Sequence, residues 1–288
     1  MPKTILSADS TCDLNAELKA QYDVQYTPLH IMLRGKDYLD NVTITNTDIY
    51  NAYWEDGSIP QTGALGPADY REHFKQFTDQ GFEVVHFSLG SGLSNSYNAA
   101  ALAAAELPGV YVVDSGNLST GIGQLVIRAG RMIAEGKTAA EIAAWAEEFR
   151  GHVHSSFILQ TMDFLAAGGR CPAIVAYVGR ILQFRPEILV NNDDGTMKVG
   201  KIYRGTMEKA LPKDVEDQLK RYGDDIIPDD IFITTSEPCE DLKDIAEEVI
   251  GKVHPFERMH RTIACCTIGG HCGPRTIGVL FTTKSACK

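Results

Sequence analysis

Four polar clusters in this chain could do chemistry, and each follows a run of residues typical of a β-strand or an extended loop. They are Asp9 to Asp13 (DSTCD), Thr62 within PQTGALGP, Ser91 to Ser94 (SGLS), and Gly269 to Pro274 (GGHCGP). In open α/β sheets, ligands bind beyond the carboxyl ends of the strands, where loops and helix N-termini offer free N–H groups. The last three clusters are therefore candidate sites, whereas Asp13 before Leu14 is predicted to be a helix N-cap.

The same residues are also compatible with two classes of enzyme. Ser94, Asp114 and His271 occur in the chain order of an α/β-hydrolase triad, although the local GLSNS lacks the second glycine of a nucleophile elbow. The stretch GSGLSN at 90–95 follows a strand and opens a helix, as a dinucleotide fingerprint does, but Asn95 stands at the third glycine position. A small-molecule hydrolase or a nucleotide-dependent enzyme is thus the alternative function.

The cysteines favour free thiols rather than a metal site. Their number, seven, is odd, and Cys265, Cys266 and Cys272 around His271 lack the paired C-x-x-C spacing of structural zinc sites. Adjacent cysteines do not easily share one tetrahedron. We therefore expect neither a metal nor a cofactor.

The first half of the chain has the pattern of βαβ units. Short β-branched or aromatic runs at 3–8, 82–88 and 109–114 are each followed by a polar turn and a helical pattern, which predicts a parallel sheet. Apolar residues at helical spacing predict two helices over 122–133 and 142–149, and Thr138 with Glu141 forms a capping box before the second. Both apolar stripes are interpreted as core.

The second half predicts another α/β unit with a mixed sheet. Strand-like runs at 156–160, 186–191, 196–203, 230–235, 260–268 and 276–283 are interrupted by predicted helices at 206–222 and 239–252. The sequence NNDDG at 191–195 is typical of a hairpin turn, so part of this sheet should be antiparallel. We expect two abutting domains, 1–152 and 153–288, with the ligand between them.

Charge and hydropathy exclude several partners. The net charge is −11, and residues 1–150 hold 10 Lys and Arg against 19 Asp and Glu, a balance that repels nucleic acid. The longest uncharged stretch, 84–105, contains four serines, two asparagines and a histidine, so it is not a membrane span. The N-terminal residues lack the pattern of a signal peptide, and we expect a cytoplasmic protein.

Six sequence blocks, in order along nearly the whole chain, resemble the signature blocks of the DegV family. They are SADSTCDL, PQT, SLGSGLSNSYNAA, VVDSGNLSTGIG, FLAAGGR and IGGHCGPRTIGV. The resemblance implies an N-terminal Rossmann-like domain, a C-terminal mixed-sheet domain and a likeness to the fatty-acid-binding subunit of bacterial fatty acid kinase. It further implies that Thr62, Ser94 and His271 hold the carboxylate of one long-chain fatty acid. Such a carrier is no enzyme by itself, and it presents the carboxylate to an ATP-dependent partner kinase.

Three arginines are candidates for orienting the head group or docking that kinase. Arg170 belongs to the GGR block, Arg204 follows a predicted strand, and Arg275 stands where the family usually has glycine. Surface salt bridging is the alternative role for Arg170 and Arg204. The loop after Thr62 also departs from the family pattern, since it reads TGALGP here.

The segment 171–185 is predicted to be an amphipathic helix. It combines apolar Ile174, Val178, Ile181 and Leu182 with Arg180 and Arg185, and the window 164–209 holds 7 Lys and Arg against 4 Asp and Glu. Two interpretations are open. The helix is either a domain-packing element or a mobile lid that touches the bilayer during acyl-chain exchange.

Overall fold

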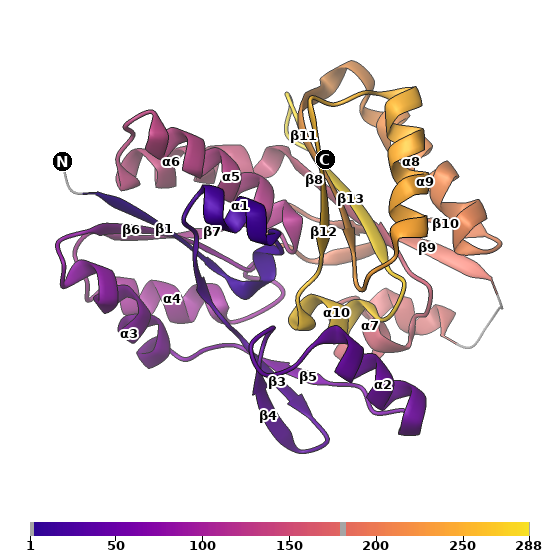
Figure 1. Cartoon of the computed structure of the whole chain (residues 1–288), viewed down its shortest axis with the longest axis horizontal. Coiled ribbons are helices and arrows are strands. Elements are labelled where there is room, and N and C mark those ends of the chain that lie inside the picture. Colours follow the sequence, from indigo (N-terminus) through magenta and orange to yellow (C-terminus); the bar gives the residue numbers. More distant parts are fainter. Residues whose placement is uncertain (1–2, 179–182, 288) are drawn as a thin grey trace.

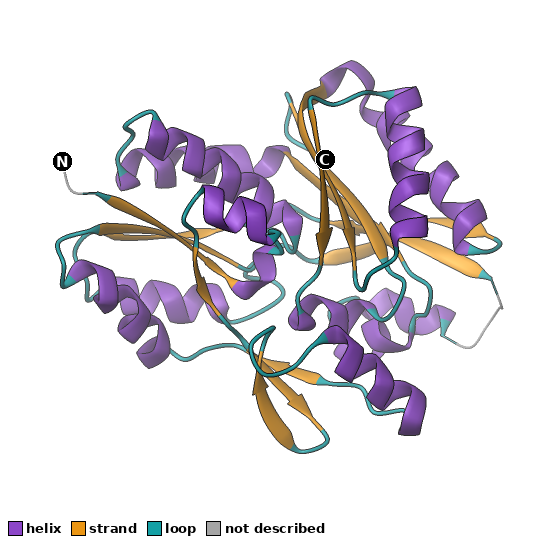
Figure 2. Ribbon diagram, viewed as in Figure 1, coloured by secondary structure: helices purple, strands orange, loops and turns teal. Residues whose placement is uncertain are grey.

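The computed structural model describes residues 3–178 and 183–287, and its strands form three separate sheets (Figure 1). One sheet is parallel with four strands, one is antiparallel with three, and one is mixed with six. Helices pack on both faces of the parallel sheet and along the mixed sheet (Figure 2). The predicted α/β class, with a parallel sheet from the first half and a mixed sheet from the second, is confirmed.

The parallel sheet has the order β2-β1-β6-β7. Its strands are β1 (Thr4–Asp9), β2 (Gln25–Thr27), β6 (Glu83–Ser88) and β7 (Val110–Asp114). Every residue of β1 is buried, because helices cover both faces of the sheet. Helices α3 (Pro67–Thr78) and α4 (Ser96–Ala104) lie on one face, while α1 (Ala16–Gln21), α5 (Thr120–Ala134) and α6 (Ala139–Phe149) lie on the other (Figure 1). The three predicted strands, both predicted helices and the Thr138–Glu141 capping box are confirmed.

A small antiparallel sheet, β4-β3-β5, lies between β2 and β6 in the sequence. It is formed by β3 (His30–Leu33), β4 (Lys36–Leu39) and β5 (Gln61–Gly63), and α2 (Asn46–Asp56) connects β4 to β5. Thr62 is the middle residue of β5 and pairs with Ile31. The sequence pattern did not predict this unit, although it positions one of the candidate ligand residues.

The mixed sheet has the order β10-β9-β8-β13-β11-β12. Its strands are β8 (Val153–Ile158), β9 (Phe184–Val190), β10 (Met197–Arg204), β11 (Ile226–Thr235), β12 (Arg258–Ile263) and β13 (Ile277–Thr283). The predicted hairpin joins β9 to β10 in antiparallel register. The two predicted helices are present as α8 (Met207–Tyr222) and α9 (Glu240–Val253), and the short helices α7 (Asp163–Gly168) and α10 (Cys266–Cys272) complete this half.

Helix α5 is the element that joins the two large sheets. It packs on β1 and β6 of the parallel sheet and on β8, β11 and β13 of the mixed sheet. One hydrophobic core therefore contains Ile122 and Leu125 of α5 together with Phe232 and Leu280 of the mixed sheet. Burial on two sides explains why every residue of this helix from Thr120 to Ile127 is buried, the polar Thr120 and Gln124 included.

Two local predictions were wrong. The expected strand over 260–268 ends at Ile263, and the chain then turns into α10, because the N–H groups of Cys265 and Cys266 donate to the side chains of Asp13 and Asp40 rather than to a neighbouring strand. The N-cap of α1 is Asn15, whose side chain accepts a hydrogen bond from Leu18 N, rather than Asp13. Asp13 has a left-handed backbone conformation, and its carboxylate bonds elsewhere.

The predicted amphipathic helix over 171–185 is wrong for the described residues. Residues Pro172–Tyr177 form a 3-10 helix, and β9 begins at Phe184. Ile174 is buried in an apolar cluster, Val178 is exposed, and Arg185 is a buried strand residue rather than part of a polar edge. The remaining candidates, Arg180, Ile181 and Leu182, lie outside the described residues.

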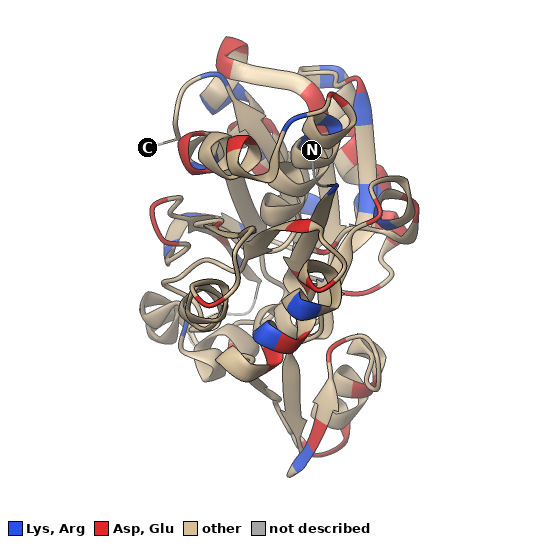
Figure 3. Cartoon of the chain, turned by 90° about the vertical axis from the view of Figure 1, so that its left-hand side faces the viewer, with Lys and Arg blue, Asp and Glu red and all other residues tan. Residues whose placement is uncertain are grey.

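Charged residues of both signs are spread along helices, loops and strands (Figure 3). Among the residues that the structure describes, no helix is both long enough and apolar enough to span a bilayer.

Candidate ligand-binding site

A cavity of about 250 Å³ lies where the polar clusters meet. Its polar lining includes Thr62, Ser94, Asn95, Arg170, Thr267 and His271. Its apolar lining includes Leu29, Leu89, Leu93, Leu118, Leu165, Met197 and Ile268. A largely apolar cavity with a few converging polar groups is the usual form of a small-molecule site.

Thr62 and His271 are brought together from β5 and α10. His271 Nε2 lies 2.8 Å from Thr62 Oγ1. Burial, assisted by the charge of Arg170, lowers the pKa of His271 to about 4, so the ring is neutral at pH 7. Nδ1 of His271 has no hydrogen-bond partner among the described residues, which favours the tautomer that carries its proton on Nε2. Nε2–H then donates to Thr62, and the threonine hydroxyl is free to donate to a ligand.

Gly168 explains how the His271 ring fits. A Cβ atom at position 168 would lie 2.1 Å from His271 Nδ1. No side chain can occupy this place unless the ring moves. Gly168 of the FLAAGGR block is therefore a packing requirement of the imidazole, whereas Gly169 has positive φ and nothing within 4 Å.

Ser94 lies in the loop before α4. Its hydroxyl lies 2.9 Å from Ser96 Oγ and accepts from Ser96 N at 3.2 Å, and the side chain is half-buried at the cavity. The start of this loop is fixed by Asp9, whose Oδ2 accepts from Leu89 N at 2.9 Å and from Ser88 Oγ at 3.0 Å. Burial by itself would raise the pKa of Asp9, but its contact with His86 and its hydrogen bonds from Tyr70 and Leu89 outweigh that and lower it.

The three candidate arginines lie in different places. Arg170 lines the cavity, and its guanidinium donates to Leu93 O at 3.3 Å and to Gly168 O at 2.7 Å. Arg204 is exposed at the end of β10 and lies over the Phe184 ring. Arg275 forms ion pairs with carboxylates on α8 and α9, Glu208 and Asp241. Only Arg170 of the three lines the cavity.

The hydrolase alternative does not fit this geometry. Asp114 accepts from Ser91 N and Gly116 N and pairs with Arg150. Within residues 3–178 and 183–287, no hydrogen bond links Ser94, Asp114 and His271 to one another. The three residues do not form a triad, since His271 bonds Thr62 instead.

The dinucleotide alternative also does not fit, because the hairpin turn between β9 and β10 covers the glycine-rich loop. Gly92 N donates to Asp194 O at 2.8 Å. A Cβ atom on Gly90 would lie 2.8 Å from the same carbonyl oxygen. These glycines accommodate another part of the chain, in the place where a phosphate would have to lie.

The cysteines near His271 are buried thiols. Burial raises the pKa of both Cys266 and Cys272 to about 12, so neither is a thiolate at neutral pH. In the part of the chain that the structure describes, no group of three or more His, Cys, Asp or Glu side chains is arranged to hold a metal.

Sequence reasoning missed the apolar lining and one buried carboxylate, Asp40. Leu165 and Met197 come from a short helix and a strand start that no motif distinguishes from ordinary core. Asp40 bonds α10, which carries His271, but it stands alone in the sequence with no pattern around it.

Known proteins match this chain over nearly its whole length. The model of the DegV family matches residues 3–284. A DegV domain-containing protein of Caldanaerobacter subterraneus subsp. tengcongensis is 29% identical over 286 residues, which cover 99% of this chain and 100% of that protein. A solved DegV family structure from Thermus thermophilus, described for its fatty acid binding, has a TM-score of 0.88 at 27% identity and covers 98% of this chain and 99% of that chain. DegV of Bacillus subtilis, described as a fatty acid binding protein, shares the fold with a TM-score of 0.83 at 20% identity, covering 99% of this chain and 100% of that one.

Proposed function

The chain belongs to the DegV family, and on this premise we propose that it is a carrier that encloses one long-chain fatty acid. The observation that carries the proposal is the form of the cavity, in which hydroxyl, imidazole and guanidinium groups converge at an otherwise apolar space. Relatives of the same fold are described as fatty acid binding proteins.

The carboxylate is proposed to lie against Thr62, Ser94 and His271. Two hydroxyls can donate to its oxygens, and the neutral imidazole orients the Thr62 hydroxyl for this role. Charge-assisted hydrogen bonds of this kind contribute about 1.5 to 3 kcal/mol each. Arg170 supplies a positive charge at the same cavity.

The acyl chain is proposed to run from this polar group along the apolar cluster under the mixed sheet. Leu165 and Cys272 line the cavity and also belong to a cluster with Phe157, Ile174 and Ile188. Burying about 14 methylenes gains on the order of 11 kcal/mol before the costs of ordering. This gain is large enough to hold the ligand without any covalent bond.

The two halves are proposed as domains 1–152 and 153–288, with the ligand between them. The strands of the parallel sheet end at Asp114, and those of the mixed sheet begin at Val153. Cavity residues come from both halves, Thr62 from the first and His271 from the second. We further propose a cytoplasmic location.

A separate ATP-dependent kinase is proposed to phosphorylate the bound carboxylate, since the sequence has no P-loop of the form G-x-x-x-x-G-K-[ST]. Arg170 at the cavity and exposed Arg204 are the docking or orienting candidates. Reversing the charge at Arg204 should slow acyl-phosphate formation while leaving the fatty acid bound. Unchanged kinetics would remove Arg204 from the kinase interface.

Transient contact with a bilayer is proposed for the segment around 171–185, where Val175 and Val178 are exposed next to the apolar cluster. Replacing both valines by Asp should slow fatty-acid transfer from vesicles without changing the affinity for dissolved ligand. Equal transfer rates would place the entrance elsewhere.

Native mass spectrometry of the protein purified from a heterologous host tests the carrier function. We expect one bound fatty acid per chain, identified by extraction. A protein that is empty and cannot be loaded with fatty acid, and that hydrolyses esters in a Ser94-dependent manner, would instead support the hydrolase alternative.

A further inference from the structure

Helix α10 carries much of the ligand site but is too short to fix itself. It has seven residues, of which Thr267, Ile268, His271 and Cys272 line the cavity. Isolated helices of this length are not stable in water. The position of His271 must therefore be set by what α10 touches.

Asp40 bonds the first turn of α10 from the opposite half of the chain. Its Oδ1 accepts from Cys266 N at 2.7 Å, and its Oδ2 accepts from Thr267 Oγ1 at 2.7 Å. Ser10 Oγ donates to the same Oδ2 at 2.7 Å. Asp40 is only 1% exposed, so these bonds are shielded from solvent.

Asp13 bonds Cys265, the residue directly before α10. Its Oδ1 accepts from Cys265 N, the N-cap residue of α10, at 2.8 Å, and its Oδ2 accepts from Ser119 Oγ at 2.6 Å. Ser119 is the N-cap residue of α5. One carboxyl group therefore joins the N-termini of two helices, and it accepts from one of the N–H groups that have no partner within α10.

Helix α2 and the residues just before β5 pack closely against the side of α10. A Cβ atom on Gly269 would lie 2.3 Å from Asn46 Oδ1, and one on Gly270 would lie 2.8 Å from Pro60. Tyr50 Oη donates to Gly269 O at 3.2 Å. The two glycines before His271 are thus explained by close contact with the first half of the chain.

From these contacts we infer that Asp13 and Asp40 are positioning residues of the ligand site, which hold α10 at the depth where His271 reaches Thr62. This inference rests on the proposed carrier function. Neither carboxylate lines the cavity, so both act through α10 rather than on the ligand. Their loss should loosen the site even though every residue that would touch the ligand is retained.

The test compares Asp40→Asn and Asp13→Ala with wild type. The aspartate accepts from Cys266 N, Thr267 Oγ1 and Ser10 Oγ with two oxygens, whereas an asparagine side chain has only one oxygen that can accept. We expect the affinity for a fluorescent fatty-acid analogue to fall roughly tenfold, the loss of about one charge-assisted hydrogen bond. NMR titration of the unliganded chain should show the His271 ring protonating at higher pH than in wild type, because the ring becomes more exposed.

Asp230→Asn is the matched control, because Asp230 is also a buried carboxylate that joins the two halves but it bonds Arg131 and Arg258 instead of α10. Even if Asp230→Asn lowers thermal stability as much as Asp40→Asn does, this control variant should bind fatty acid with the affinity of wild type. If Asp40→Asn weakens binding no more than the control, and the His271 titration does not move, the positioning role is wrong. Should Asp40→Asn not fold, Ser10→Ala removes only one of the three hydrogen bonds of Asp40, changes no residue of the cavity lining, and is judged by the same two readouts.

The two proposals fail in different ways. If wild type binds no fatty acid, the carrier function is wrong, while the His271 titration still decides whether the carboxylates position α10. If wild type binds but the variants match the control, only the positioning role is wrong.

Discussion

Thr62 lies on strand β5, Ser94 in the loop before α4 and His271 on helix α10, and they meet because these three separate elements reach one cavity. Each side chain has a different environment. Thr62 bonds the imidazole, Ser94 bonds its neighbour Ser96, and the imidazole is neutral because it is buried. The group is suited to donate hydrogen bonds to a carboxylate without ionising.

Ser94→Ala should weaken fatty-acid binding by about 1 to 3 kcal/mol, because the carboxylate loses a donor while it stays partly desolvated. Isothermal titration with a soluble medium-chain acid measures the effect. Ser91→Ala is the matched control, since Ser91 lies in the same loop but does not line the cavity. Equal affinities for the two variants would place the carboxylate elsewhere.

Asp13 should make stability depend on pH near neutrality. Burial raises its pKa to about 7, against which the hydrogen bonds from Ser119 and Cys265 act only partly. Because this pKa is above that of the unfolded chain, the stabilising contribution is complete below about pH 4 and is lost as pH rises to about 7. The free energy of unfolding of wild type relative to Asp13→Asn should fall by about 1.4 kcal/mol per pH unit in this window. Parallel urea-unfolding profiles for the two proteins would contradict the assignment.

What the sequence predicted at this scale came from motifs. Thr62, Ser94 and His271 belong to blocks that resemble a family, and the structure brings all three to one cavity. Asp40 could not be found in this way, since its role depends on a contact with Cys266 that spans more than two hundred residues. The N-cap prediction for Asp13 failed for the same reason, because its partners are distant in sequence.

At the scale of elements, the turn between β9 and β10 has a role beyond reversing the chain. It packs on the loops that follow β6 and β7, where Gly92 N donates to Asp194 O and Asn117 Nδ2 donates to Asn192 Oδ1. Composition predicted the turn from NNDDG correctly. The packing of this turn on Gly90 and Gly92 could not be predicted, because a glycine-rich loop of this kind is equally compatible with phosphate binding.

Gly116→Ala should displace this turn. Gly116 has φ +55°, and a Cβ atom there would lie 2.1 Å from Asn192 O, a backbone atom that cannot rotate away. We expect a loss of about 2 to 4 kcal/mol in the free energy of unfolding, from strain and overpacking together, and weaker ligand binding because nearby Met197 lines the cavity. Gly136→Ala is the control, since Gly136 also has positive φ but nothing within 4 Å. Similar losses for both variants would mean that backbone strain alone matters.

The segment 171–185 shows where periodicity misleads. Apolar residues at helical spacing predicted an α-helix, but the described part is a short 3-10 helix followed by strand β9. Ile174 and Arg185 are both buried, one against apolar neighbours and one within the sheet. Tertiary packing decided the structure of a segment whose pattern suits either state.

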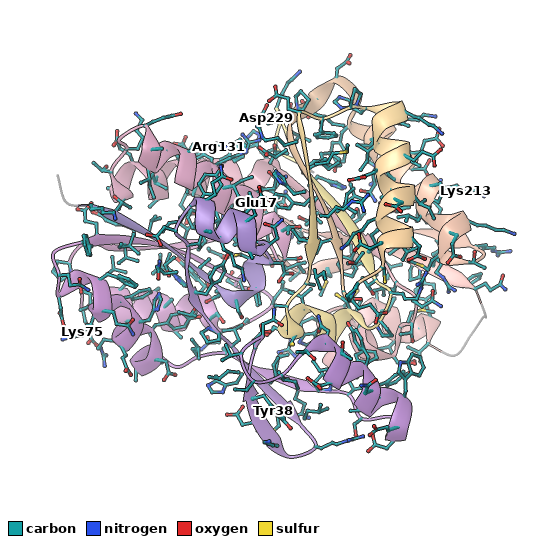
Figure 4. All side chains as sticks on the ribbon, viewed as in Figure 1. Glu17, Tyr38, Lys75, Arg131, Lys213 and Asp229 are labelled. Carbon is teal, nitrogen blue, oxygen red and sulfur yellow. The ribbon has the colours of Figure 1, made fainter. Side chains whose placement is uncertain are left out.

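At the scale of the whole molecule, the two halves are joined by the shared core around α5 and by an ion cluster beside it. Asp230 of β11 is fully buried and pairs with Arg131 of α5 at 2.7 Å, with Arg258 at 2.9 Å and with His260 at 2.8 Å. Arg131 and Asp229, the residue before Asp230, are labelled in Figure 4. Burial by itself would raise the pKa of Asp230, but the hydrogen bonds from His260, Arg131 and Arg258 outweigh it and hold the pKa far below its usual range. These ion pairs thus join α5 to the mixed sheet, and their strength depends on the charge of Asp230.

Asp230→Asn should therefore lower the free energy of unfolding at pH 7 by about 2 to 4 kcal/mol, because it leaves cations without their buried partner. Neighbouring Asp229, which pairs with Arg128 at 3.4 Å and is 35% exposed, is the matched control, and Asp229→Asn should cost less than about 1 kcal/mol. Since the pKa of Asp230 is lower in the folded chain than in the unfolded one, its contribution is present above about pH 4 and is lost as pH falls. The difference between wild type and Asp230→Asn in urea unfolding should shrink by about 1.4 kcal/mol per pH unit below about pH 3.9. A difference that stays constant down to pH about 2.5 would show that packing, rather than the charge of Asp230, joins the two halves.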